Sequence, residues 1–153
     1  MIKHINCDIF ESGADIILHQ VNCQGIMGSG IAKQVREKYP NVYARYRQLC
    51  EEMKDNRAEL LGKTQFVRTS EDCYIVNLFA QENFGYSGKC YTDYNALRKC
   101  LERVRSRCWG VTIAIPYLMG CYRGGGRWDV VYSMIQEIFG DNHTVLICEY
   151  NGK

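Results

Sequence analysis

Several absences narrow the kind of protein that this sequence encodes. No apolar run approaches the roughly 20 residues that cross a bilayer, and residues 1–4 lack the apolar stretch of a secretory signal. We therefore expect no membrane partner and no secretion. Only two prolines occur, Pro40 and Pro116, and no linker, internal repeat or low-complexity tract interrupts the chain. A single domain over residues 1–153 is the expectation, because domains usually run to about 100–200 residues.

Cysteine is plentiful, but its spacing argues against two common uses. The nine cysteines form an odd count, and no two are spaced as Cys-x-x-Cys. A secreted disulfide framework and a zinc ribbon are therefore poor explanations, and we expect no metal. Cysteines that act as small buried apolar residues suit a reducing cytoplasm, or a nucleus in a eukaryote. The formal charge of +2 is too small to indicate nucleic-acid binding by the bulk field.

Short apolar runs alternate with helical segments along the chain. The runs are rich in β-branched residues, as in strands that are buried on both faces. They cover residues 15–21, 73–79, 111–115 and 144–148, with weaker candidates at 4–7 and 63–67. Apolar residues at helical spacing lie within 31–39, 94–104 and 128–138, with Thr92 or Asp93 as the N-cap of the second segment. The alternation predicts a three-layer α/β/α fold, with helices on both faces of a mixed, largely parallel sheet.

Two glycine-rich segments each follow a predicted strand and lead into a predicted helix. The first spans residues 21–32, and the second spans 116–128 with three consecutive glycines between Arg123 and Arg127. Neither contains Gly-Lys-Ser/Thr or Gly-x-Gly-x-x-Gly. One such loop is well explained by tight turns alone. Two in equivalent contexts favour a crevice for a diphosphate, because glycine permits close backbone approach and helix N-termini carry free N–H groups.

Several segments of the chain together resemble the macrodomains, which are α/β/α modules that recognise ADP-ribose. The resemblance covers nearly the whole chain. It rests on Asn6-Cys7-Asp8-Ile9-Phe10, on residues 19–25 leading into Gly28-Ser29-Gly30-Ile31-Ala32, on residues 92–97, and on residues 115–121 followed by Gly126-Arg127-Trp128.

The resemblance assigns binding roles by position. Asp8 matches the acidic residue that accepts a hydrogen bond from the adenine amino group, with the backbone of Ile9 beside it; the alternative for Asp8 is a helix or turn cap. Asn22 matches the asparagine that contacts the distal ribose. Tyr150 is expected to close the adenine end, unless it only packs. The first phosphate loop matches Gly28, Ser29, Gly30 and Ile31, and the second matches Gly120, Cys121, Tyr122, Arg123, Gly124, Gly125 and Gly126.

The nearest subgroups by resemblance are the terminal ADP-ribose protein glycohydrolases and the ADP-ribose-1''-phosphate phosphatases. Where the glycohydrolases use a lysine and an aspartate, this chain has Gln81 and Gly124, which cannot form a Schiff base or act as a base. His19 matches a histidine of the phosphatases and is a candidate general acid or base, assisted by Asn22, with a buried core histidine as the alternative.

These observations lead to one expectation and two rivals. We expect a monomer that needs no cofactor, binds ADP-ribose, a derivative of it or an ADP-ribosylated macromolecule, and hydrolyses the group at the 1'' carbon. The first rival is a non-catalytic ADP-ribose reader, favoured by Gln81 and Gly124. The second is an RNA-binding module that uses the basic segment 98–107, for which a solvated outer face is the simpler explanation.

Overall fold

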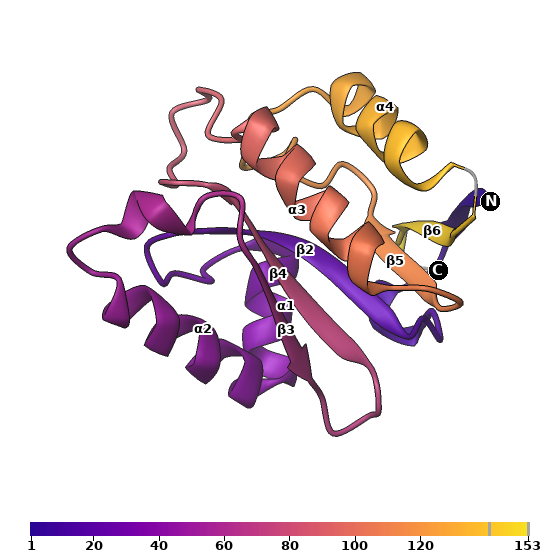
Figure 1. The fold of residues 1–153 in the computed structure, drawn as a ribbon, viewed down its shortest axis with the longest axis horizontal. Coiled ribbons are helices and arrows are strands. Elements are labelled where there is room, and N and C mark those ends of the chain that lie inside the picture. Colours follow the sequence, from indigo (N-terminus) through magenta and orange to yellow (C-terminus); the bar gives the residue numbers. More distant parts are fainter. Residues whose placement is uncertain (141, 153) are drawn as a thin grey trace.

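The computed structural model describes residues 1–140 and 142–152. A six-stranded sheet lies between helices on either side (Figure 1). In chain order the strands are β1 (Ile2–Asn6), β2 (Ile16–Asn22), β3 (Thr64–Arg68), β4 (Tyr74–Gln81), β5 (Thr112–Pro116) and β6 (Thr144–Glu149). The helices are α1 (Gly30–Lys38), α2 (Pro40–Glu52), α3 (Tyr94–Arg107) and α4 (Trp128–Phe139), with short 3₁₀ turns at Ile9–Glu11 and Arg57–Leu60.

The strand order of the sheet is β1-β6-β5-β2-β4-β3. All neighbouring strands are parallel except β3, which pairs antiparallel with β4. The carboxyl ends of β1, β6, β5, β2 and β4 therefore share one edge of the sheet. The segments that follow β2 and β5, which are the two glycine-rich segments, leave the sheet side by side because these two strands are neighbours.

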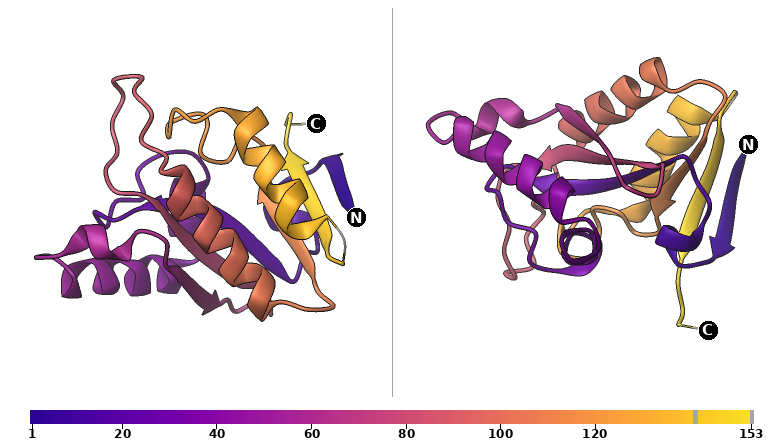
Figure 2. Two further views of the ribbon diagram at one scale, coloured as in Figure 1. Left: turned by 45° about the horizontal axis from the view of Figure 1, so that its top comes forward. Right: turned by 90° about the horizontal axis from the view of Figure 1, so that it is seen from below.

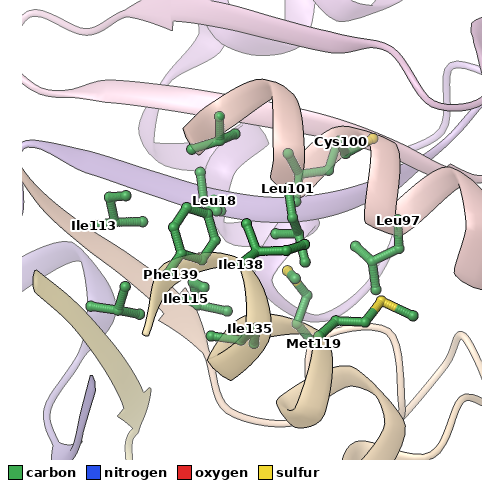
Figure 3. Packing of buried hydrophobic residues seen from close by; sticks show 14 of the residues in the cluster. Leu18, Leu97, Cys100, Leu101, Ile113, Ile115, Met119, Ile135, Ile138 and Phe139 are labelled. Carbon is green, nitrogen blue, oxygen red and sulfur yellow. The ribbon is translucent and has the colours of Figure 1, made fainter. Parts of the chain in front are cut away.

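Each face of the sheet has its own hydrophobic core. On one face, α3 and α4 pack on side chains such as Leu18 and Ile115, and Figure 3 shows Leu101 and Phe139 meeting them. On the other face, α1 and α2 contribute Val35 and further buried residues to a second core. Figure 2 shows the two helix pairs on opposite sides of the sheet. The three-layer α/β/α prediction is confirmed.

The predicted strands all form, and their ends differ from the prediction by at most two residues, the largest differences being the start of β1 and the end of β4. Asp93 is the N-cap of α3, since its side chain accepts a hydrogen bond from the Ala96 N–H at 3.0 Å. The helix α2 was not predicted from the sequence. A pattern was available there, because Val42, Tyr46 and Cys50 recur every four residues after Pro40 at the first helical position.

The cysteines are all free thiols. Cys23, Cys50, Cys100, Cys108 and Cys148 are buried, as expected for small apolar residues, whereas Cys90 is exposed and the remaining three are half-buried. Within residues 1–140 and 142–152, no helix combines the length and apolar character that a membrane span requires.

Candidate functional site

A cavity of about 520 Å³ lies at the carboxyl edge of the sheet, between the two glycine-rich segments. The lining contains no aspartate, glutamate or lysine, and Arg123 is its one residue with a permanent charge among the residues described. Such a cavity suits an anion better than a cation. It is lined by His19, Gln20, Val21, Asn22, Ile26, Gly28, Ser29, Gly30, Ile31, Ala32, Gln34, Gln81, Phe84, Tyr86, Pro116, Tyr117, Leu118, Met119, Gly120, Tyr122, Arg123 and Gly124.

The N-terminus of α1 opens into this cavity. The first intrahelical bond runs from the Lys33 N–H to the Ser29 oxygen at 3.2 Å. The N–H groups of Gly30, Ile31 and Ala32 therefore have no acceptor within the helix, and all three residues line the cavity. Free amides and the positive end of the helix dipole together favour a negatively charged group at this point.

Asn22 and Tyr46 fix the shape of the first glycine loop. The Asn22 Oδ1 accepts the Gln24 N–H at 2.9 Å, and its Nδ2 donates to the Ile26 oxygen at 2.8 Å. The buried hydroxyl of Tyr46, which comes from α2, lies 2.7 Å from the Asn22 main-chain oxygen and accepts the Gly25 N–H at 3.2 Å. The Asn22 side chain thus forms most of its hydrogen bonds within the loop, although it also lines the cavity.

The second glycine loop is fastened to the segment that precedes α3. The Thr92 hydroxyl donates to the Gly120 oxygen at 2.6 Å, and the Thr92 N–H donates to the Gly124 oxygen at 3.0 Å. Gly125 has a φ of +70°, and a Cβ there would lie 2.3 Å from the Lys89 oxygen. Only glycine fits this position, because both the backbone conformation and the contact exclude a side chain.

His19 is a buried histidine in which one ring nitrogen forms a hydrogen bond and the other has no hydrogen-bond partner. Its Nε2 lies 2.6 Å from the Asn77 Oδ1, and the Asn77 Nδ2 donates to the Gln65 Oε1 at 2.9 Å. Since Asn77 presents its oxygen to the ring, Nε2 carries the proton and Nδ1 is an acceptor. Burial lowers the pKa of His19 to about 4, against the opposing effect of the Asn77 hydrogen bond. The ring is therefore neutral near pH 7.

Two buried side-chain polar atoms in the described part of the chain lack a hydrogen-bond partner, and both belong to residues that line the cavity. They are the Nδ1 of His19 and the Oε1 of Gln20. Both are acceptors, and buried acceptors are ordinarily satisfied. The cavity thus offers amide donors at the helix N-terminus and unpaired acceptors at β2, a combination that suits a ligand with both phosphate and hydroxyl groups.

Some of the predicted site residues lie outside this cavity. Asp8 lines a neighbouring hollow of about 320 Å³ that shares Gln34 with the main cavity. Its Oδ1 accepts the Phe10 N–H at 3.0 Å, so the cap alternative is realised whether or not it also meets adenine. Ile9 is buried in the core. Tyr150 follows β6 and is 60% exposed, and Cys121, Gly125 and Gly126 of the second loop are not among the residues that line the cavity.

The thiols near the site are not activated. Burial raises the pKa of Cys23 to about 12 and that of Cys121 to about 11. Both stay protonated near neutral pH, and a protonated thiol is a poor nucleophile. Neither cysteine is a candidate for covalent catalysis.

Several residues that line the cavity were not predicted from the sequence. Phe84 and Tyr86 come from the segment between β4 and α3, which projects beyond the body of the molecule in Figure 2. This segment has no periodic pattern, so nothing in the sequence placed it over the cavity. Gln34 of α1 and Tyr117 also went unassigned, although each belongs to a segment that the analysis had singled out.

The chain is similar in sequence to two kinds of curated protein, while no protein-family model matches it. It is 28% identical over 144 residues to a DNA ADP-ribosyl glycohydrolase of Mycobacterium tuberculosis, covering 91% of this chain and 39% of that protein. It is 26% identical over 97 residues to an ADP-ribose 1''-phosphate phosphatase of Meyerozyma guilliermondii, covering 55% of each. The chain therefore spans about two fifths of the length of the glycohydrolases that it matches.

Solved structures resemble the chain over almost its whole length. The macrodomain of Thermus aquaticus DarG superposes with a TM-score of 0.79 at 23% identity, covering 97% of this chain and 98% of that one. A macrodomain protein from Streptomyces coelicolor gives a TM-score of 0.80 at 24% identity, with 99% and 100% covered. Thermosipho africanus DarTG in complex with ADP-ribose gives 0.77 at 18% identity, with 99% and 42% covered. The chain has the macrodomain fold.

In this chain, the side chain at the expected lysine position forms hydrogen bonds with neighbouring segments of the fold. Gln81, at the end of β4, accepts from the Gln20 Nε2 at 2.8 Å and donates to the Asn83 oxygen at 2.8 Å. Gly124, at the expected aspartate position, is buried against Thr92. Neither position carries an acid or a base, so any chemistry in this cavity needs groups other than that pair.

Proposed function

We propose that this macrodomain binds ADP-ribose, or a derivative modified at the 1'' carbon, in the cavity between its two glycine loops, and that it hydrolyses the group at that carbon. The observation that carries the binding proposal is the pairing of free α1 amides with the unpaired acceptors of His19 and Gln20 in one cavity that lacks carboxylates. The amides suit a diphosphate, and the acceptors suit the hydroxyls of a ribose.

The order of the strands indicates how the proposed ligand would lie along the carboxyl edge of the sheet. Asp8 follows β1 at one side of the carboxyl edge, the two glycine loops follow β5 and β2 in the middle, and the segment with Phe84 follows β4 at the other side. A ligand with its adenine at Asp8 and its diphosphate at the loops therefore extends its distal ribose toward β4. This direction brings the distal ribose toward His19, at the middle of β2.

Hydrolysis is supported by the names of the curated relatives and by His19. In the neutral ring, Nδ1 can accept a proton but has none to give, so the proposed role narrows from acid or base to general base. A water held between the diphosphate and the loop amides would pass a proton to Nδ1 as its oxygen bonds to the reacting atom of the group at the 1'' position. The bond from that atom to the leaving group breaks in the same reaction, and the leaving group takes up the proton from Nδ1, which restores the neutral ring. The second loop would contribute by positioning the substrate and stabilising charge.

The second candidate function is a non-catalytic reader of ADP-ribose. One observation favours it: the residues that line the cavity include no carboxylate and no lysine within the described part of the chain. Incubation with ADP-ribose-1''-phosphate, O-acetyl-ADP-ribose, and ADP-ribosylated protein or DNA separates the two candidates. Turnover of any of them supports the enzyme, and micromolar ADP-ribose binding without turnover of any supports the reader.

Calorimetry with ADP-ribose tests the binding mode, with two variants at Asp8. Asp8→Ala removes both the carboxylate and the cap of the 3₁₀ turn, whereas Asp8→Ser keeps a cap for the Phe10 N–H. We expect both variants to weaken binding to a similar extent if the carboxylate meets adenine. Unchanged affinity in both variants would refute that role, and a loss in Asp8→Ala alone would assign the effect to the cap.

A further inference from the structure

Three polar side chains, His19, Asn77 and Gln65, lie in a row across the neighbouring strands β2, β4 and β3. The strand register places Asn77 opposite His19 on one side and opposite Gln65 on the other. Alternate residues of a strand share a face, so Asn77 lies on the same face as Ile75 and Phe79, which belong to the core under α1 and α2. Asn77 is fully buried and His19 is 2% exposed. These two side chains therefore depend on protein groups for their hydrogen bonds.

The direction of the hydrogen bonds in this row is set by a main-chain oxygen of α2. The Gln65 Nε2 donates to the Arg45 oxygen at 3.1 Å, and a carbonyl oxygen can only accept. Gln65 therefore presents its Oε1 to the Asn77 Nδ2 at 2.9 Å, and Asn77 presents its Oδ1 to the His19 Nε2 at 2.6 Å. Reversal of either amide would bring two oxygens or two N–H groups face to face. The orientation of each side chain thus determines that of the next, and the proton of the neutral ring is held on Nε2.

The tautomer of His19 decides what its other ring nitrogen can do at the cavity. His19 lines the cavity, and its buried Nδ1 has no hydrogen-bond partner. Without a proton, Nδ1 can accept one from a water or a hydroxyl group, whereas in the opposite tautomer it could only donate. The two tautomers have the same charge and the same shape, so the difference between them lies only in the hydrogen bond that Nε2 forms.

We propose that Gln65 and Asn77 are positioning residues, which fix the tautomer of His19 and thereby present its Nδ1 to the cavity as an acceptor. Neither residue lines the cavity, and Gln65 belongs to the edge strand β3, whose five residues are all absent from the lining. Gln65 acts on the site only through Asn77. This inference rests on the proposed role of His19 as a general base, and it names the residues that make this role possible.

Nitrogen NMR of the protein with isotope-labelled histidine, recorded near pH 7 without ligand, tests the inference directly. Protonated and unprotonated ring nitrogens give separate signals, and the signals of His19 are those that disappear in His19→Asn. We expect an unprotonated Nδ1 in the wild-type protein. Gln65→Leu removes the acceptor for the Asn77 Nδ2, so the amide can turn over and the ring should become a mixture of both tautomers. Gln65→Glu retains an acceptor and should keep the wild-type tautomer.

Thr64→Leu is the matched control for the apolar substitution. It places the same side chain one residue earlier on β3, where the side chain shares a face with Phe66, on the side of the sheet that α3 and α4 cover. This variant should keep the wild-type tautomer. A purely structural role for Gln65 would lower the melting temperature of Gln65→Leu without changing the ring signals.

Turnover links the tautomer to function. With a substrate that the wild-type protein hydrolyses, kcat of Gln65→Leu should fall in proportion to the fraction of rings with the proton on Nδ1, because these rings cannot act as a base; equal populations would give a loss of about twofold. The inference is overturned if Nδ1 is protonated in the wild type, if Gln65→Leu keeps the wild-type tautomer, or if Gln65→Glu or Thr64→Leu changes it as Gln65→Leu does. Absence of turnover by the wild type would instead refute the proposed hydrolysis, while the NMR spectra would still decide the tautomer.

Discussion

Replacement of Tyr46 by phenylalanine tests whether a side chain of α2 holds the first glycine loop in its binding shape. The Tyr46 hydroxyl lies 2.7 Å from the Asn22 main-chain oxygen and 2.8 Å from its Oδ1, and it accepts the Gly25 N–H at 3.2 Å. Burial raises the pKa of this hydroxyl far above its ordinary value, so it remains a donor throughout the neutral range. Tyr46→Phe removes these contacts without changing the ring.

The expected cost follows from the groups that lose a partner. The Asn22 Oδ1 keeps its bond from the Gln24 N–H, but the Gly25 N–H and the Asn22 main-chain oxygen are left without the hydroxyl. Leaving a buried polar group unpaired costs about 1–3 kcal/mol. For a domain of this size, a loss of about 2 kcal/mol lowers the melting temperature by roughly 4–8 °C. The loosened loop should weaken ADP-ribose binding by about tenfold, which corresponds to about 1.4 kcal/mol.

Tyr39→Phe is the matched control for this experiment. Tyr39 is equally buried, and its hydroxyl donates to the Glu71 Oε1 at 2.6 Å, away from the cavity. Both variants should melt earlier than the wild type by calorimetry, but only Tyr46→Phe should bind ADP-ribose more weakly. Wild-type affinity in Tyr46→Phe, or an equal loss of affinity in Tyr39→Phe, would show that the hydroxyl does not hold the loop for binding.

The remaining predictions concern pH and the second loop. The pKa of His19 falls from 6.5 to about 4 on folding, so the folded state disfavours the protonated ring. The free energy of unfolding is therefore highest above pH 6.5 and decreases as the pH falls toward 4. Urea unfolding should show a decrease of about 3 kcal/mol over this range, which a His19→Asn variant lacks. Gly125→Ala should lower the melting temperature far more than Gly88→Ala. Both glycines have a positive φ, but only at Gly125 would the added Cβ clash with a backbone atom. Equal effects of the two substitutions would exclude this clash as the cause. Thr92→Val should raise the Kd for ADP-ribose while α3 stays intact by circular dichroism, because the Gly120 oxygen keeps the Gly126 N–H but loses the bond that ties the loop to Thr92; an unchanged Kd would show that the Thr92 hydroxyl does not support the loop.

The sequence predicted that the two glycine-rich loops lie at one edge of the sheet, because each loop follows a buried run that can be recognised by itself. Buried runs of β-branched residues, such as residues 15–21 and 111–115, indicate parallel strands. The loops that follow neighbouring parallel strands begin at the same edge of the sheet. The N-cap of α3 was predicted as Thr92 or Asp93, since capping depends on residues three positions apart, and the structure selects Asp93.

What the sequence did not predict depends on contacts between distant segments. The hydrogen-bond partner of His19 is determined by the register between β2 and β4, in which His19 lies opposite Asn77. The hydrogen bond from Tyr46 to Asn22 of the first glycine loop joins residues that are 24 positions apart, and Tyr46 belongs to the helix α2, which was not predicted. The position of Tyr86 follows from a segment without periodicity, stacked on Arg123 of another loop. None of these pairings leaves a pattern in a single sequence.

The central claim is that main-chain amides of the two glycine loops hold a diphosphate, and amide NMR spectroscopy during titration with ADP-ribose tests it most directly. We predict that the largest shifts fall on the amides of residues 28–32 and 122–124, and that ADP gives shifts at the same amides. Shifts confined to the exposed basic face of α3, or no shift at millimolar ADP-ribose, would contradict it.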